Sequence, residues 1–125
     1  ARAELNIVGN YDLNVLNFPA KAEKWRRRKH PLKYLAFRWA YEQLSPANRA
    51  FLRGLPSQIR IEAAGLNVLM VHGSPTSVKE HLTPKTPVER LRELARIAQA
   101  EVILCGHSHQ PFARLVDGVW FVNPG

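Results

Sequence analysis

LNVLMVHGSP, residues 66–75, is the stretch that decides the fold. Its first part, residues 66–71, is largely apolar, which predicts a strand that is buried on both faces of a sheet. The strand ends at His72-Gly73-Ser74-Pro75, where Gly and Pro signal a turn. A buried strand that runs into a polar turn is the arrangement in which α/β proteins place functional residues.

Further strands are predicted on both sides of this stretch. Ile59, Ile61 and Ala63 alternate with polar residues, and Ala64-Gly65 fits a turn into the strand that follows. Near the end of the chain, Asp117-Gly118 is a two-residue hairpin signal. The strands predicted from such patterns cover residues 4–8, 59–63, 66–71, 101–105, 112–116 and 119–122.

Helices are predicted between the strands, which indicates an α/β or α+β class. Pro31 opens a pattern of apolar residues at helical spacing, and Ser45-Pro46 fits an N-cap with proline at the first helical position. A third helix follows Thr86, with Glu89 completing a capping box. The faces expected to be buried are Leu32, Leu35, Ala36, Trp39, Ala40 and Leu44 on the first helix, and Val88, Leu91, Leu94, Ala95 and Ala98 on the third.

The composition indicates one globular domain. The chain has 125 residues, 46% hydrophobic residues and three Trp, which argues against disorder and leaves room for one core, so residues 1–125 are expected to form a single domain. No apolar run reaches the roughly 18–20 residues that a membrane-spanning helix needs. Cys105 is the only cysteine, which excludes an internal disulfide and fits a reducing cytoplasm. Strand-like runs near both ends, with no starting Met, predict a fragment of a longer domain.

Three loops hold the residue types that carry chemistry. They are Gly9-Asn10-Tyr11-Asp12, His72-Gly73-Ser74-Pro75 and Gly106-His107-Ser108-His109, and each follows an apolar run. Sites in layered α/β folds gather beyond the carboxyl ends of strands, so the three loops are expected to meet. Together they offer an amide oxygen, three imidazoles and a carboxylate, a donor set that suits a divalent metal. Each His alone also fits a hydrogen-bonded strand end, but the shared position of the loops favours a site.

The order Gly-Asn-x-Asp, His-Gly-Ser-Pro, Gly-His-Ser-His and Asn-Pro-Gly resembles the calcineurin-like metallophosphoesterases, and most of all their small bacterial and archaeal phosphodiesterases. The resemblance implies a four-layer α-β-β-α sandwich with a dinuclear metal site between strand ends. It implies that Asn10, His72 and His107 hold one metal and that His109 holds the other. Two divalent ions, with Mn expected first and Fe, Zn or Ni as alternatives, would activate a hydroxide that hydrolyses a phosphate ester, expected to be a phosphodiester.

The chain departs from the family pattern in two ways. The motifs Asp-x-His and Gly-Asp-x-x-Asp, which precede Gly-Asn-x-Asp in the family and supply a bridging carboxylate and most ligands of the second metal, are absent. The given chain is therefore expected to bind metal weakly and to turn over little substrate. Tyr11 stands where the family often has a His that acts on the leaving group, and Asp12 stands where the acid paired with that His would be. Tyr11 and Asp12 are the catalytic candidates, with packing as the alternative role for Tyr11.

Residues 21–38 form a basic segment with eight Lys/Arg and one acid, Glu23. The segment is expected either to steer a phosphate-bearing substrate or to be a solvated helix face, and any contact with nucleic acid is expected to lack sequence specificity. Outside the three loops, Cys105 is predicted to be a buried packing residue. His30 and His81 are predicted to be surface histidines outside the site.

Two other function classes fit the same residues. One is a non-catalytic protein-interaction scaffold on the phosphoesterase fold, which Tyr11 fits but the retained histidines do not. The other is a nucleic-acid-binding module that uses residues 21–38, whose binding would depend on salt and survive loss of the histidines. The leading expectation is a cytoplasmic metal-dependent phosphoesterase acting on a phosphate-ester substrate, with no membrane partner and no assigned oligomeric state.

Overall fold

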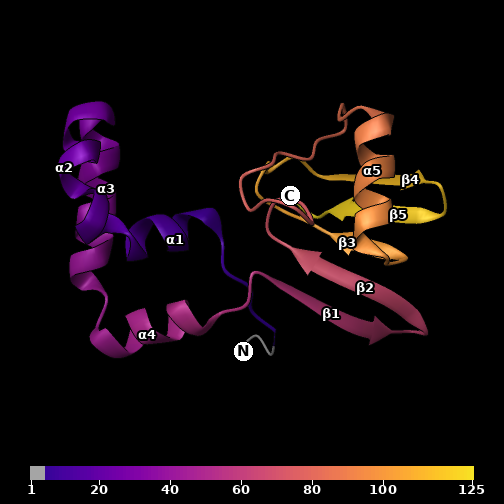
Figure 1. The fold of residues 1–125 in the computed structure, drawn as a ribbon, viewed down its shortest axis with the longest axis horizontal. Helices are drawn as coiled ribbons and strands as arrows, with labels where there is room; N and C mark the ends of the chain where they lie inside the picture. The colour runs from indigo at the N-terminus through magenta and orange to yellow at the C-terminus, as the bar shows by residue number, and fades with distance from the viewer. Residues whose placement is uncertain (1–4) are drawn as a thin grey trace. The chain divides into compact units, whose positions relative to one another are not determined.

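The structure, a computed structural model, describes residues 5–125. Its contacts separate into two compact units. The sheet unit comprises Pro56–Gly125 with residues 5–9, and the helical unit comprises Asn10–Leu55. The expectation of a single domain over residues 1–125 stays a prediction. The elements follow the chain in the order α1 (Asn10–Leu16), α2 (Phe18–Arg28), α3 (Pro31–Gln43), α4 (Pro46–Gly54), β1 (Gln58–Ala63), β2 (Leu66–Val71), α5 (Val88–Ala98), β3 (Val102–Leu104), β4 (Phe112–Val116) and β5 (Val119–Asn123) (Figure 1).

The sheet unit is built on one five-stranded sheet with the strand order β1-β2-β3-β5-β4. The three central strands β2, β3 and β5 are parallel, whereas β1 and β4 pair antiparallel at the two edges. The register places Leu104 beside Met70 on one side and beside Val122 on the other, so the carboxyl ends of the parallel strands lie together. The loops that follow β2 and β3 therefore leave the sheet at the same edge.

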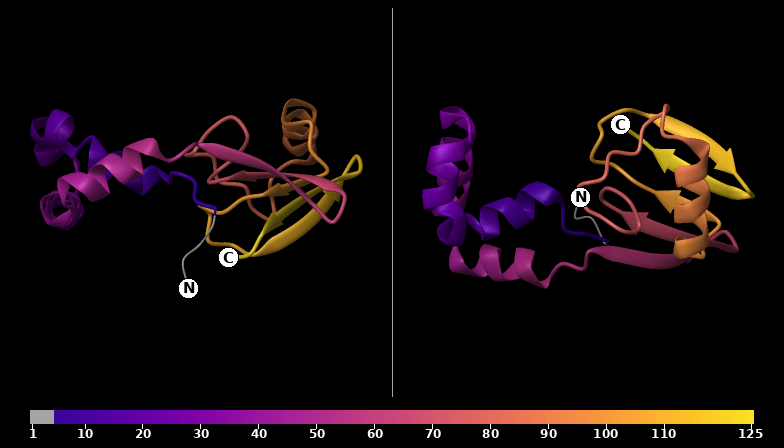
Figure 2. Two further views of the ribbon diagram at one scale, coloured as in Figure 1. Left: turned by 90° about the horizontal axis from the view of Figure 1, so that it is seen from below. Right: turned by 45° about the horizontal axis from the view of Figure 1, so that its top comes forward.

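Helix α5 covers one face of this sheet (Figure 2). The predicted face of α5 is confirmed, because Leu91 and Leu94 are fully buried and pack in one core with the strand residues Leu69, Ile103 and Phe121. Burying a side chain of this size contributes about 1.5–3 kcal/mol, which makes this core the main source of stability in the unit. The predicted α/β class is confirmed, and the sheet unit supplies one sheet and one helical layer.

Both hairpins turn as predicted. Ala64 and Gly65 have φ angles of 52° and 77°, and Asp117 and Gly118 have φ angles of 50° and 80°. Positive φ at both central residues is the geometry that matches the twist of the flanking strands, and glycine adopts it without steric cost.

The helical unit packs around aromatic rings. Phe18, Trp25 and Phe37 are buried, with Tyr34 and Tyr41 packed against them. The ring centroids of Trp25 and Phe37 are 5.4 Å apart, and those of Phe18 and Tyr34 are also 5.4 Å apart, distances typical of favourable aromatic pairs. These rings join α2 to α3.

The predicted buried face of α3 is wrong. Leu32 and Trp39 are 70% and 66% exposed, and Leu35 is also exposed. The buried face carries Phe37 and Tyr41, on the opposite side of the helix. Both sides of α3 are apolar at helical spacing, so the period alone could not tell which one packs, and the aromatic side was favoured by the rings that α2 presents.

Three further predictions are corrected. Residues 5–9 form no strand, and the Val8 N–H there donates to the Pro56 carbonyl oxygen at 2.9 Å. Residue 4 of the predicted strand lies outside the described residues. Asn10 begins α1, so residues 10–12 form the first helical turn rather than a loop. The capping box at α5 is absent, because Thr86 Oγ1 instead accepts from the Thr83 N–H and Pro87 occupies the N-cap.

Between residues 5 and 125, no helix combines the length and apolar character needed to cross a membrane.

Candidate metal centre

Two imidazoles meet at the carboxyl end of the parallel strands. His72 follows β2 directly, and His107 follows β3 after a short turn. Nε2 of His72 lies 3.2 Å from Nδ1 of His107, and the ring centroids are 4.9 Å apart. The Gly106 N–H donates to the His72 carbonyl oxygen at 2.9 Å, which ties the two strand ends together.

The other nitrogen of His107 has a backbone partner. Nε2 lies 3.2 Å from the carbonyl oxygen of Lys79. A carbonyl oxygen can only accept, so Nε2 carries the proton and Nδ1 of the neutral ring offers its lone pair toward His72. Burial, followed by the charge of His81, lowers the pKa of His107, and the bond to Lys79 opposes that shift. The neutral ring that a metal requires is therefore favoured.

The spacing of the two imidazole nitrogens fits one metal ion. A metal–nitrogen bond is about 2.1 Å, so two nitrogens on one ion lie about 3.0 Å apart at octahedral angles and about 3.4 Å apart at tetrahedral angles. The observed 3.2 Å between His72 and His107 falls within this range. Metal-binding histidines also donate their second N–H to a carbonyl or carboxylate, as His107 does to Lys79. Across residues 5–125, no three or more His, Cys, Asp or Glu side chains gather in a way that could hold a metal ion.

The loop after β3 holds both of its histidines in unusual backbone conformations. The φ angles of His107 and His109 are 61° and 56°. Left-handed backbone at residues other than glycine costs of order 1 kcal/mol and is concentrated at functional sites. On a regular strand, residues two apart point to the same face of the sheet. The left-handed backbone at His107 and His109 departs from a regular strand, so it sets the direction of each ring independently.

Asn123 supports this loop from β5. Its side chain is 2% exposed, and its Nδ2 donates to the Gly106 carbonyl oxygen and to Ser108 Oγ, both at 2.9 Å. Its Oδ1 accepts from the Gly125 N–H at 2.9 Å. The Asn-Pro-Gly motif thus braces the histidine loop, a role that the sequence analysis did not assign. The available signal was a polar residue at the end of an otherwise apolar strand.

His81 also contacts the candidate metal centre. The sequence pattern predicts a surface histidine outside the site, and the His81 side chain is indeed exposed. Its ring nevertheless lies 4.0 Å from that of His107, centroid to centroid, with an interplanar angle of 34°. The signal for this contact is that His81 belongs to the same connection, between β2 and α5, that begins with His72.

The sequence profile of the calcineurin-like phosphoesterase superfamily domain matches residues 3–125. The chain belongs to this superfamily. A relative named "Probable metallophosphoesterase" from Methanothermobacter thermautotrophicus is 30% identical over 70 residues, which cover 56% of this chain and 37% of that protein. The resemblance drawn from the four motifs is thereby confirmed.

Solved structures share the fold. A hypothetical protein from Pyrococcus horikoshii OT3 has a TM-score of 0.77 and 21% identity, covering 95% of this chain and 50% of that one. The metallophosphoesterase from Sphaerobacter thermophilus has a TM-score of 0.70 and 20% identity, covering 95% of this chain and 52% of that one. The chain thus spans about half the length of these two proteins.

The remaining candidates from the superfamily pattern stay predictions. His109 is exposed, and its charge contributes to the lowered pKa of His107. Asn10, Tyr11 and Asp12 lie in the first turn of α1, in the helical unit. Tyr11 packs edge-on against Phe37 with 5.2 Å between ring centroids, and its catalytic and packing roles both stay predictions.

Cys105 lies in the hydrophobic core of the sheet unit. Its side chain is buried, and its thiol lies 3.6 Å from the Val122 carbonyl oxygen. Burial raises the pKa of the Cys105 thiol to about 11, so the reactive thiolate is scarce near neutral pH. The prediction that Cys105 is buried in the core is confirmed.

Proposed function

We propose that the full-length protein is a cytoplasmic metal-dependent phosphoesterase that hydrolyses a phosphodiester at a dinuclear centre, with Mn²⁺ as the first expected ion. The observation that carries the proposal is the pair of imidazoles at the strand ends. Nε2 of His72 and Nδ1 of His107 are 3.2 Å apart, and the remaining N–H of His107 is held by a backbone carbonyl. This is the local arrangement that a ligated histidine pair needs.

The residues of this chain would bind the ions and keep the centre electropositive. His72 would bind through Nε2 and His107 through Nδ1, and the superfamily pattern adds Asn10 to the same ion and His109 to the other. When bound, divalent ions supply positive charge against the phosphoryl oxygens and activate water for attack. The neutral imidazoles and the Asn10 amide leave that charge uncancelled, so an anionic ester remains attracted.

The leaving group receives little acid assistance in this proposal. Tyr11 occupies the position where related enzymes often have His, and a phenol is a weaker acid than an imidazolium. Esters with good leaving groups should therefore react fastest. A steep fall in kcat with rising leaving-group pKa supports this role for position 11, and a flat dependence contradicts it.

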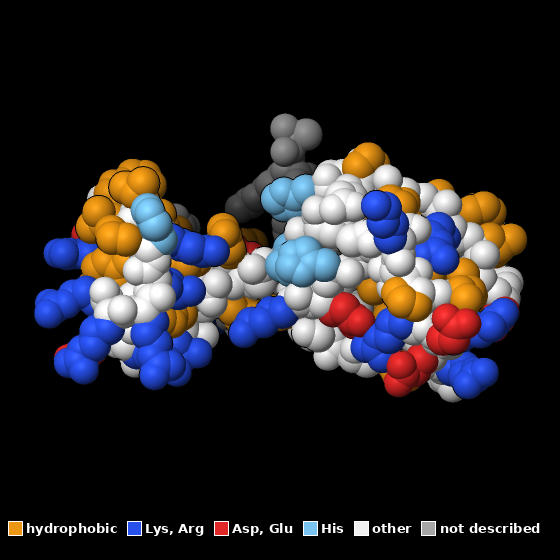
Figure 3. All heavy atoms as spheres, turned by 90° about the horizontal axis from the view of Figure 1, so that it is seen from above, with side chains coloured by type: hydrophobic (Ala, Val, Ile, Leu, Met, Phe, Trp, Pro, Cys, Tyr) orange, Lys and Arg blue, Asp and Glu red, His pale blue; other side chains and the backbone are white. Residues whose placement is uncertain are grey.

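The charge of the helical unit favours an anionic substrate. Residues 10–55 hold ten Lys/Arg against three acids, so this unit carries +7 of the chain's +8. Lys and Arg side chains are prominent on the face of this unit that Figure 3 shows. A field of this sign raises the encounter rate with phosphate esters and weakens as salt screens it. The expected result is that kcat/KM falls with ionic strength, more steeply in the wild type than after Arg26, Arg27 and Arg28 are replaced by Gln. Tight polyanion binding that survives loss of His72 and His107 would instead favour the nucleic-acid alternative.

The test uses the full-length protein and two site variants. Mn²⁺ content and hydrolysis of bis(p-nitrophenyl) phosphate are measured for wild type, His72→Ala and His107→Ala. His30→Ala is the matched control, because His30 caps α3 in the helical unit by accepting from the Leu32 N–H. The proposal expects both site variants to lose bound metal and hydrolysis while the control keeps them. A wild type that binds no metal and hydrolyses nothing would overturn the proposal in favour of the scaffold alternative.

A further inference from the structure

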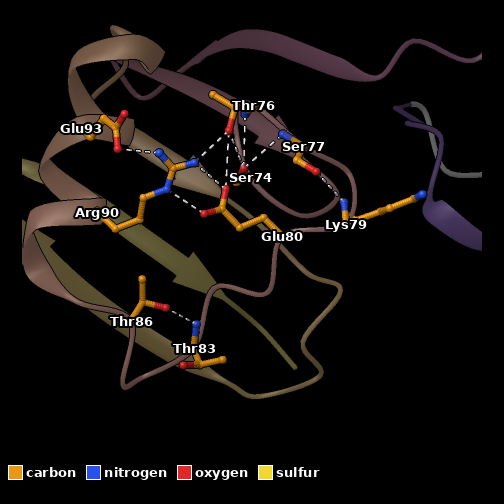
Figure 4. A network of polar contacts seen from close by, with 9 residues as sticks. All are labelled: Ser74, Thr76, Ser77, Lys79, Glu80, Thr83, Thr86, Arg90 and Glu93. Carbon is orange, nitrogen blue, oxygen red and sulfur yellow. Dashed lines mark hydrogen bonds and ion pairs between the residues drawn. The ribbon is translucent and has the colours of Figure 1, made fainter.

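Besides His72, the connection between β2 and α5 supplies two groups that contact His107 from outside its own loop. These are the Lys79 carbonyl oxygen and the His81 ring. The segment between them contains Glu80, whose carboxylate points toward α5 (Figure 4). The position of the Lys79 carbonyl therefore depends on what holds Glu80.

Arg90 on α5 holds Glu80 through a bidentate ion pair. Its Nε donates to Glu80 Oε1 at 2.7 Å, and its Nη2 donates to Oε2 at 3.0 Å. The same Nη2 lies 3.1 Å from Thr76 Oγ1, so one guanidinium contacts both ends of the segment 76–80 (Figure 4). The Arg90 and Glu80 side chains are only 32% and 22% exposed, and a bidentate pair of this kind is geometrically stiff.

The backbone of the segment has little room to shift. A Cβ on Gly73 would lie 2.5 Å from the Ser77 carbonyl oxygen and 2.8 Å from that of Glu80. The Ser74 N–H also donates to the Ser77 carbonyl oxygen at 2.8 Å. The residues next to His72 therefore pack directly against the segment that carries Lys79.

We infer that Arg90 and Glu80 are positioning residues for the metal centre. Their ion pair fixes the Lys79 carbonyl as the acceptor for the His107 Nε2–H. This bond selects the tautomer in which Nδ1 of His107 is available beside Nε2 of His72. The expected consequence rests on the proposed function. Breaking the Arg90–Glu80 ion pair should lower metal affinity about 10–100-fold, which is the usual effect of losing a hydrogen-bond partner of a metal-binding histidine.

The test reads the tautomer directly in the full-length, metal-free protein. Two-bond ¹H–¹⁵N correlations of the histidine rings are recorded above the pH at which the rings titrate, for wild type, Arg90→Gln and Glu80→Gln. Mn²⁺ affinity is measured on the same samples. The wild type should show His107 as a single Nε2–H tautomer. Both variants should show mixed tautomers and weaker Mn²⁺ binding, with the overall fold retained by circular dichroism.

Two controls separate positioning from general stability. Glu93→Gln removes the other carboxylate on Arg90, at 2.6 Å from Nη1, but leaves the pair with Glu80 intact. Lys79→Ala removes a side chain but keeps the carbonyl. Neither should change the tautomer or the Mn²⁺ affinity. If Arg90→Gln does not fold, Arg90→Lys keeps the positive charge without the planar fork and takes its place.

The outcomes distinguish the inference from the proposed function. An unchanged His107 tautomer and unchanged Mn²⁺ affinity in folded Arg90 and Glu80 variants would overturn the positioning role. A wild type that binds no Mn²⁺, yet loses its single tautomer in Arg90→Gln, would overturn the proposed function and leave the positioning role standing.

Discussion

The side-chain amide of Asn123 donates to the carbonyl oxygen of Gly106 at 2.9 Å, between the ends of the neighbouring parallel strands β5 and β3. The bond joins the last residue of one strand to the loop that carries His107 and His109. Because Asn123 is almost fully buried, water cannot replace the bond when the amide is removed.

Asn123→Ala should therefore destabilise the protein. The Gly106 carbonyl loses a buried donor, and the expected loss is about 1–3 kcal/mol in the free energy of unfolding. Asn67→Ala is the matched control, because Asn67 is exposed on β2. Urea denaturation of the two variants checks this, and equal losses of stability would contradict the bracing role.

Gly73→Ala should be costly because the space for a side chain is filled by backbone. The added Cβ would approach the Ser77 and Glu80 carbonyl oxygens to 2.5 and 2.8 Å, so the segment beside His72 must move. We expect a loss of about 1–3 kcal/mol, the usual cost of overpacking, together with weaker metal binding. Gly54→Ala, where nothing lies within 4 Å of the new Cβ, should leave stability unchanged or raise it by up to about 1 kcal/mol. Thermal unfolding of both variants decides the matter, and similar melting temperatures would refute it.

Glu80 should make stability depend on pH in the acid range. The hydrogen bond from Arg90 holds the pKa of Glu80 below its ordinary value of 4.5. A carboxyl whose pKa is lower in the folded state stabilises the protein fully above its ordinary pKa, and this contribution disappears as the pH falls through the lowered value. At pH 7, the free energy of unfolding of the wild type should exceed that of Glu80→Gln by about 1–2 kcal/mol, because the Arg90–Glu80 pair is charge-assisted but partly exposed. Urea unfolding between pH 7 and pH 3 should show this difference shrinking below about pH 4.5. A difference that stays constant with pH would contradict the stabilising role of the Glu80 carboxylate.

His107→Gly and His107→Ala should separate ligand loss from backbone strain. The φ angle of 61° at His107 suits glycine and disfavours alanine. Both variants lose the imidazole and should bind metal equally poorly. The Gly variant should nevertheless be more stable than the Ala variant by about 1 kcal/mol. Chemical denaturation of the metal-free proteins provides the comparison, and an Ala variant at least as stable as the Gly variant would argue against strain in this loop.

Most of the sheet was predictable because its signals are local. Alternation over residues 59–63, the apolar run 66–71 and the turn at Asp117-Gly118 each depend on residues adjacent in sequence, and each matches the structure. The face of α3 was not predictable, since Leu32 and Phe37 mark two apolar sides and only contact with α2 chooses between them.

The candidate metal centre was predictable in part for the same reason. His72 and His107 follow buried strands, and parallel strands bring their carboxyl ends together. The contact of His81 with His107 and the role of the Lys79 carbonyl involve partners far apart in sequence and a backbone atom that every residue possesses. No residue type signals such contacts.

The sequence by itself determined the superfamily, the order of β1 to β5 along the chain and the two histidines that follow β2 and β3. These follow from short-range patterns of apolar residues, turns and polar strand ends. Only the tertiary structure decided which atoms of those histidines meet, because the tautomer of His107 depends on a carbonyl 28 residues away. The position of that carbonyl depends in turn on Arg90 and Glu80, whose ion pair forms only when α5 packs on the sheet and brings the two side chains together.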